Sequence, residues 1–113
     1  ETPANAASVP RPACGLTTSW PSWINVENFA AFHNLPLASR GNGFGGLDAE
    51  LTFNNPAMVR HIAQLAEWQV TKVFDYSGRG QSAEPRFQNG ECGIFIGSSA
   101  TRGRTGESGF ASR

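Results

Sequence analysis

Two cysteines, Cys14 and Cys92, place the strongest restraint on how this chain can fold. They are the only cysteines among 113 residues. An even cysteine count in a short chain favours a disulfide, which would close a loop of about 80 residues and stabilise the fold by roughly 4 to 5 kcal/mol. The alternative is a pair of reduced, buried thiols in a cytosolic protein. Two isolated cysteines without nearby histidines do not predict a zinc site or any other metal site.

The first residues of the chain favour an exported protein over a cytosolic one. The chain starts at Glu1 with "ETPANAASVPRPA", a Pro-rich and Ala-rich stretch typical of the linker left after a signal peptide is removed. An artificial start of the expressed chain would look the same. No apolar run approaches the roughly 20 residues that a membrane-spanning helix needs. We therefore predict a secreted, extracellular protein without a membrane span.

The charge composition of the chain does not favour a polyanionic partner. Charged residues make up 16% of the chain, the net charge is zero and the isoelectric point is about 7.0. Nothing here indicates a nucleic-acid partner or an anionic membrane, and no motif specifies a cofactor. The length predicts one domain. We expect a flexible arm over 1–12, a single α+β domain over 13–97 and a Gly/Ser/Arg-rich segment over 98–113, anchored by Phe110.

Two helices are indicated by capping signals and apolar spacing. The stretch "NNPAMVRHIAQLAEW" predicts a helix with Asn55 as its N-cap and Pro56 in the first helical position. Its apolar residues recur at helical spacing. The stretch "NVENFAAFHNLP" predicts a shorter helix that is capped by Asn25 and stopped by Pro36.

Strands are indicated by alternation and by turn residues. The stretches 13–19, 47–53 and 69–76 each have strand character, and "LDAELTF" at 47–53 alternates most cleanly. Asn89-Gly90 is a strong hairpin signal, which predicts that 86–88 pairs with 91–97 through a type I′ turn. The expected fold class is α+β, with a small antiparallel or mixed sheet of about four strands, two helices packed on it and one disulfide.

The glycine-rich segments do not match nucleotide-binding motifs. Around Gly97 and Gly103 the spacing is wrong for a P-loop, Arg104 stands where the lysine should be, and no helical pattern follows. The segment "GNGFGG" precedes a predicted strand and not a helix, so it is not a dinucleotide fingerprint. Both segments are interpreted as turns. Arg102 and Arg104 could bind a phosphate or an acidic partner, or they could belong to a solvated arm.

Aromatic residues supply the main binding hypothesis. Trp20 and Trp23 flank a proline in "SWPSW" and are the most plausible exposed aromatics. Exposed tryptophans could stack on sugars or anchor a protein partner. The alternative is that they fill the core under the first helix. The predicted partner is a protein or glycan target.

An enzyme would have to use one of two histidines, His33 or His61. Each has an ordinary packing explanation on its helix. Paired carboxylates on the outward face of 47–53, Asp48 and Glu50, are also what an ordinary solvent-facing strand carries. A small hydrolase such as a ribonuclease would pair a base with an acid and a cation. The available residues are His61 or His33, Glu67 or Glu50, and Arg79 or Arg86, and their convergence is not visible in the sequence.

Both ends of the chain resemble those of small secreted fungal proteins of the effector and killer-toxin-like kind. The resemblance is carried by "ETPANAASVPRPACG" and "NGECGIFIGSS", a processed-looking start and a late cysteine-bearing strand. It implies a virulence-related molecule that acts on another cell or host component. The leading prediction is thus a non-enzymatic, effector-like or toxin-like interaction protein, with the hydrolase as the alternative.

Overall fold

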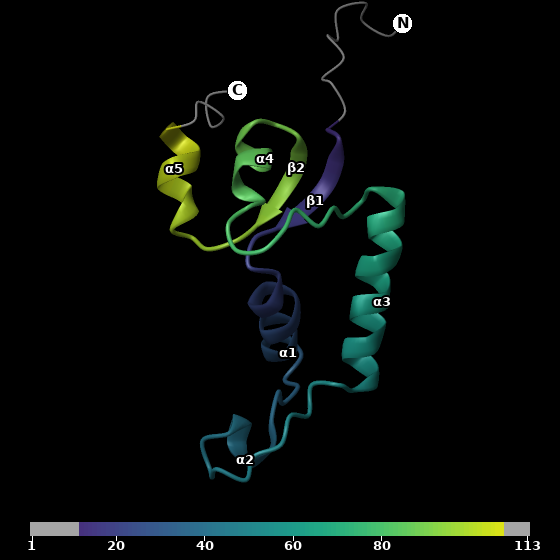
Figure 1. Cartoon of the computed structure of the whole chain (residues 1–113), viewed down its shortest axis with the longest axis vertical. Coiled ribbons are helices and arrows are strands. Elements are labelled where there is room, and N and C mark those ends of the chain that lie inside the picture. The colour runs from purple at the N-terminus through teal and green to yellow at the C-terminus, as the bar shows by residue number, and fades with distance from the viewer. Residues whose placement is uncertain (1–11, 108–113) are drawn as a thin grey trace, which may run out of the picture.

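The computed structural model describes residues 12–107, and the elements below refer to that range. Figure 1 shows a two-stranded sheet with α4 beside it and α5 on the far side of α4, then α1 and α3 lying alongside each other, and α2 at the opposite end. In chain order the elements are β1 (Cys14–Thr18), the π-helix η1 (Trp23–Asn28), α1 (Phe29–Phe32), α2 (Ser39–Asn42), α3 (Pro56–Thr71), α4 (Glu84–Gln88), β2 (Cys92–Ile96) and α5 (Thr101–Glu107).

The sheet is parallel and is joined at one end by the disulfide. β1 pairs with β2 in a register that sets Cys14 opposite Cys92 and Thr18 opposite Ile96. The two cysteines are bonded, so the predicted disulfide is confirmed. β1 also forms a single parallel bridge to Phe74 on its other side. The core is centred on β1, where Cys14 and Thr17 are fully buried.

The expected fold class is wrong. Residues 12–107 contain two strands in one parallel sheet and five α-helices, not four strands with two helices. The stretch 47–53 forms only one isolated bridge, Ala38 to Leu51, and the side chains of Leu47 and Leu51 are exposed. Alternation predicts which side of a strand is apolar, but a strand forms only where another strand offers hydrogen bonds. Here the pairing stops at that one bridge, where the Ser39 N–H donates to the Glu50 carbonyl and the Thr52 N–H donates to the Leu37 carbonyl.

The predicted strand over 69–76 and the predicted hairpin are also wrong. Gln69 continues α3, which ends at Thr71 with Lys72 in the left-handed conformation. Asn89-Gly90 ends α4: Gly90 has a φ of 77°, its N–H donates to the Phe87 carbonyl, and the Glu91 N–H donates to the Arg86 carbonyl. A glycine that follows a helix in this conformation caps the last carbonyls. The same dipeptide therefore serves a helix end as well as a hairpin.

The helix signals were more reliable. α3 starts at Pro56, and the Asn55 side chain accepts a hydrogen bond from the Met58 N–H at 2.9 Å, as the capping signal predicted. The earlier helix begins sooner than predicted, because η1 already starts at Trp23 and Asn25 lies inside it. No helix within 12–107 is long and apolar enough to cross a membrane.

The segment after β2 forms a helix that the sequence did not predict. α5 covers Thr101–Glu107. Its Arg104 donates to the buried carboxylate of Glu84 on α4, with Nε to Oε1 at 2.6 Å and Nη2 to Oε2 at 3.0 Å. This hydrogen-bonded ion pair anchors α5 to α4. Residues 1–11 of the predicted arm, and 108–113 with the predicted anchor Phe110, lie outside the described residues.

The Glu84 ion pair predicts a loss of stability in acid. The hydrogen bonds from Arg104 lower the pKa of Glu84 below its ordinary value of 4.5, although burial acts in the opposite direction. A carboxyl whose folded-state pKa is lowered contributes stability above its unfolded-state pKa and loses it as the pH falls through the folded-state pKa. We expect the unfolding free energy to fall below about pH 4.5, and Glu84→Gln to lessen that fall while lowering stability at pH 7. Urea unfolding between pH 2.5 and 7 measures both, with the exposed Glu27→Gln as the control; a Glu84→Gln acid profile parallel to that of the wild type would contradict the prediction.

Candidate ligand-binding site

A pocket of about 350 Å³ opens where the chain leaves β1. One wall comes from the residues just after the strand, and the other comes from the loop between α3 and α4. Its lining residues are Trp20, Pro21, Ser22, Tyr76, Arg79 and Gly80.

Trp20 is held in the pocket by backbone contacts on both sides. The Ser19 N–H donates to the Ile96 carbonyl of β2 at 3.1 Å, and the Trp20 N–H donates to the Gly80 carbonyl at 2.7 Å. Trp20 has a φ of 43°, a conformation that is costly for a large side chain and that is enriched at functional sites. Its residue surface is 43% exposed, so the indole is not the core plug that was the alternative prediction.

Tyr76 and Arg79 complete the chemistry of the pocket. Tyr76 is half exposed, and its phenol offers both an apolar ring face and a hydroxyl. Arg79 is exposed at the same pocket and offers a guanidinium fork, which suits carboxylate and phosphate groups. An indole, a phenol and a guanidinium around one opening suit a small ligand that carries an anionic group.

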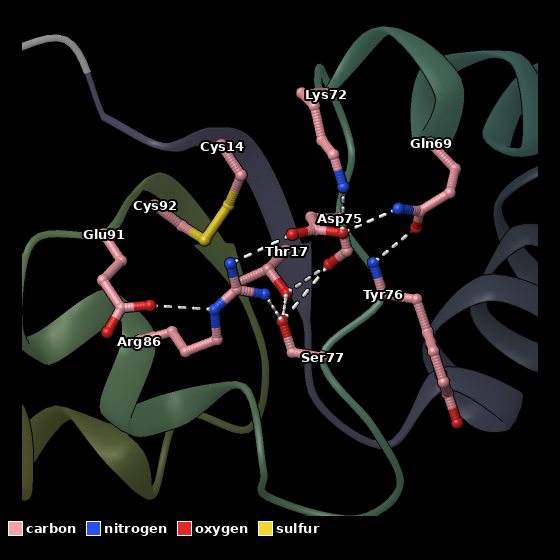
Figure 2. Close-up of a disulfide and its surroundings, with 10 residues drawn as sticks. All are labelled: Cys14, Thr17, Gln69, Lys72, Asp75, Tyr76, Ser77, Arg86, Glu91 and Cys92. Atoms are coloured by element: carbon pink, nitrogen blue, oxygen red, sulfur yellow. Dashed lines mark hydrogen bonds and ion pairs between the residues drawn. A yellow bond between two sulfur atoms is a disulfide. The ribbon is translucent and has the colours of Figure 1, made fainter.

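A cluster of polar side chains lies behind the Tyr76 loop (Figure 2). The carboxylate of Asp75 accepts hydrogen bonds from Gln69 at 2.6 Å, Arg86 at 3.0 Å and Lys72 at 3.3 Å. The bond from Gln69 is the largest cause that lowers the pKa of Asp75, burial opposes it, and Arg86 and Lys72 lower it further. The bonds to Glu91 and then Asp75 raise the pKa of Arg86. Asp75 is thus held as an anion and Arg86 as a cation.

The four predicted binding residues are not brought together. Trp20 lines the pocket, whereas Trp23 lies half-buried in η1 and is not among the lining residues. Arg102 is exposed on α5, and Arg104 is engaged by Glu84. Only Trp20 therefore remains in the candidate site, and Arg79, which was first considered for catalysis, joins it.

The candidate catalytic residues do not form one site. The Nε2 atom of His61 lies 2.8 Å from the Asn25 carbonyl, and its ring stacks on Phe29 with 3.8 Å between centroids. Glu67 accepts a hydrogen bond from Gln64 on an exposed part of α3, and Arg79 lies in the Trp20 pocket. Glu50 is exposed beside Ser39, which donates its backbone N–H to the Glu50 carbonyl. Within 12–107 no group of three or more His, Cys, Asp or Glu residues could hold a metal ion.

Sequence reasoning missed Tyr76 because it was counted as the last residue of a strand. The residues that follow it are "SGRG". A lone tyrosine next to a glycine-rich loop that also carries an arginine was the available signal. Loops held by a rigid scaffold often carry binding residues.

Comparisons with known proteins identify what the chain is similar to. It is 44% identical over 89 residues to the sn-glycerol-3-phosphate-binding periplasmic protein UgpB of Yersinia enterocolitica, which is 79% of this chain and 20% of that protein. It is also 44% identical over 88 residues to the protein of the same name from Escherichia coli K12, again 20% of the relative. The chain thus spans about one fifth of the length of the curated relatives that it matches. No protein-family model matches it.

These relatives correct four sequence predictions. They are bacterial binding proteins, so the resemblance to fungal effectors and killer toxins is wrong, and so are the effector, toxin and virulence functions drawn from it. The hydrolase alternative is wrong for the same reason. The relatives are named for a small phosphorylated ligand and give no support to a protein or glycan target. The coarser prediction of an exported, disulfide-bonded chain is confirmed by the disulfide and by the periplasmic relatives.

Proposed function

We propose that this chain forms part of a periplasmic solute-binding protein and supplies one wall of its glycerol-3-phosphate site. The observation that carries the proposal is the pocket at the end of β1, where Trp20, Tyr76 and Arg79 converge. The name that the relatives share supports the choice of ligand. A periplasmic location also agrees with the Cys14–Cys92 disulfide, because disulfides persist in oxidising compartments.

The chemistry of the pocket matches both halves of this ligand. Glycerol-3-phosphate has a three-carbon chain with hydroxyl groups and a phosphate. The rings of Trp20 and Tyr76 can cover the carbon chain, and the phenol can exchange hydrogen bonds with a hydroxyl group. The Arg79 guanidinium can pair with two phosphate oxygens. The pocket is open, as expected for one wall of a site completed by other parts of a larger protein.

The surface of α3 supports the idea that more polypeptide packs here. One side of the helix faces η1 and α1, where Met58 is buried and Leu65 is half-buried. A second apolar stripe recurs at helical spacing on a different side, and all its members are exposed: Val59, Ile62, Ala63, Ala66 and Val70. A helix that is apolar on two sides is typical of one that is buried between two layers. The polypeptide that makes up the other four fifths of the relatives would supply the second layer.

Arg79 gives the proposal its test, because it separates the phosphate from the glycerol part. In a chimera, the chain would replace its matched segment in the Escherichia coli relative. Titration calorimetry would measure the binding of glycerol-3-phosphate and, as the phosphate-free control, of glycerol. We expect Arg79→Gln to weaken glycerol-3-phosphate binding about 10-fold or more, the value of one charge-assisted hydrogen bond, and to leave any binding of glycerol unchanged.

Arg102→Gln is the matched control, since it removes another exposed arginine outside the pocket. It should leave the dissociation constant unchanged. A chimera that is folded by circular dichroism and yet fails to bind glycerol-3-phosphate would overturn the proposed function. Equal losses for Arg79→Gln and Arg102→Gln would contradict the role of Arg79.

A further inference from the structure

Arg86 connects three parts of the molecule at the base of the Tyr76 loop. It lies on α4, and its Nη1 donates to the Ser77 hydroxyl at 2.6 Å, while Nη2 donates to Asp75 at 3.0 Å. Its Nε donates to Glu91, beside the disulfide, at 3.1 Å. The two loop residues that it holds are the immediate neighbours of Tyr76. One guanidinium therefore holds the side chains of the residues on both sides of a pocket residue without itself lining the pocket.

The remaining contacts of the loop reinforce this arrangement. The Tyr76 N–H donates to the Gln69 side chain at 2.7 Å, and the same side chain donates to Asp75. The Thr17 hydroxyl of β1 donates to the Asp75 carbonyl at 2.8 Å and lies 2.8 Å from the Ser77 hydroxyl. These bonds attach the loop to β1, α3 and α4 at once.

The ring of Tyr76 points away from the polar cluster that holds its backbone. In Figure 2 the hydrogen-bonded groups gather around Asp75, and the ring of Tyr76 extends away from them. The ring is half exposed and lines the Trp20 pocket. The polar cluster thus acts on the backbone of Tyr76, while the ring is left for the ligand.

We propose that Arg86, acting through Asp75 and Ser77, is a positioning residue that presets Tyr76 against Trp20 and thereby sets the affinity of the pocket. Because Arg86 already holds the loop in place, the ligand does not have to order it, and binding avoids that entropic cost. Lysine at this position would keep the charge but could not form the fork to two loop residues. The proposal rests on the proposed function for its ligand, but its structural part can be tested without one.

Tyr76 is the single tyrosine of the chain, so it can be observed alone. The 113-residue chain would be produced with 3-fluorotyrosine, and its one ¹⁹F resonance would be recorded for the wild type, Arg86→Gln, Arg86→Lys and Asp75→Asn. We expect the resonance to move toward that of the urea-unfolded chain in Arg86→Gln and Asp75→Asn, and to move less in Arg86→Lys. Arg40→Gln is the control, because it breaks the Arg40–Asp48 ion pair in the loop around α2; it should leave the resonance unchanged. An unchanged resonance in folded Arg86→Gln would overturn the proposal, and Arg86→Lys decides the matter if Arg86→Gln does not fold.

A double-mutant cycle in the chimera connects positioning to affinity. We expect Arg86→Gln to weaken glycerol-3-phosphate binding about 10-fold in the wild type, but less than about 2-fold when Tyr76→Ala is already present. A purely structural role would give the same loss in both backgrounds and would overturn the proposal. Failure of the wild-type chimera to bind the ligand would overturn the proposed function alone, because the fluorine experiment still tests the positioning of Tyr76.

Discussion

Replacing Trp20 with alanine is expected to weaken glycerol-3-phosphate binding by about 30-fold or more. The indole lines the pocket, is partly exposed and is held at a positive φ by the bond from its N–H to Gly80. Aromatic anchors of this kind commonly account for 2 kcal/mol or more of binding free energy, and 2 kcal/mol is about a 30-fold change in the dissociation constant. Titration calorimetry on the chimera measures the change. Stability should fall little, because much of the side chain is already in contact with water.

Trp23→Ala is the natural comparison, since it removes the same side chain three residues later. Trp23 lies in η1 and is not among the lining residues of the pocket. We expect this variant to lose stability and to keep its affinity where it folds. The opposite pattern, with binding lost in Trp23→Ala and kept in Trp20→Ala, would move the site away from the end of β1.

Removing the disulfide is expected to produce the largest loss of stability. Cys14 and Cys92 are separated by 78 positions in the sequence and are paired across the two strands. A cross-link that closes a loop of this length stabilises by roughly 4 to 5 kcal/mol in the chain-entropy account, an amount comparable with the whole stability of a small domain. The Cys14→Ser, Cys92→Ser double variant should therefore be largely unfolded at 37 °C.

Urea unfolding with and without a phosphine reductant measures this effect. The reductant should destabilise the wild type by about as much as the double substitution does and should leave the double variant unchanged. Thiol titration would first show that the reductant has broken the bond in the wild type. If the wild-type unfolding curves with and without the reductant then coincided, the disulfide would contribute nothing to the free energy of unfolding.

Much of the local structure followed from short-range signals. Asn55 and Pro56 fixed the start of α3, because an N-cap side chain and a proline in the first turn act within a few residues of the chain. The strand character of 13–19 and 91–97 was also predicted, and both segments contain strands. The ends of the chain misled the assignment of a family, because a processed-looking start and a cysteine-bearing strand occur in unrelated exported proteins.

The sequence by itself determined the disulfide and the start of the long capped helix, since these depend on residue type and local spacing. Only the tertiary structure decided that β1 pairs in parallel with β2, that Asn89-Gly90 ends a helix, and that 47–53 lacks a strand partner. It alone placed Trp20 beside Tyr76 and Arg79, more than fifty residues later in the chain. The physical reason is that strand pairing and pockets depend on which distant segments meet, and the free energy of those contacts is not encoded in the pattern of either segment alone.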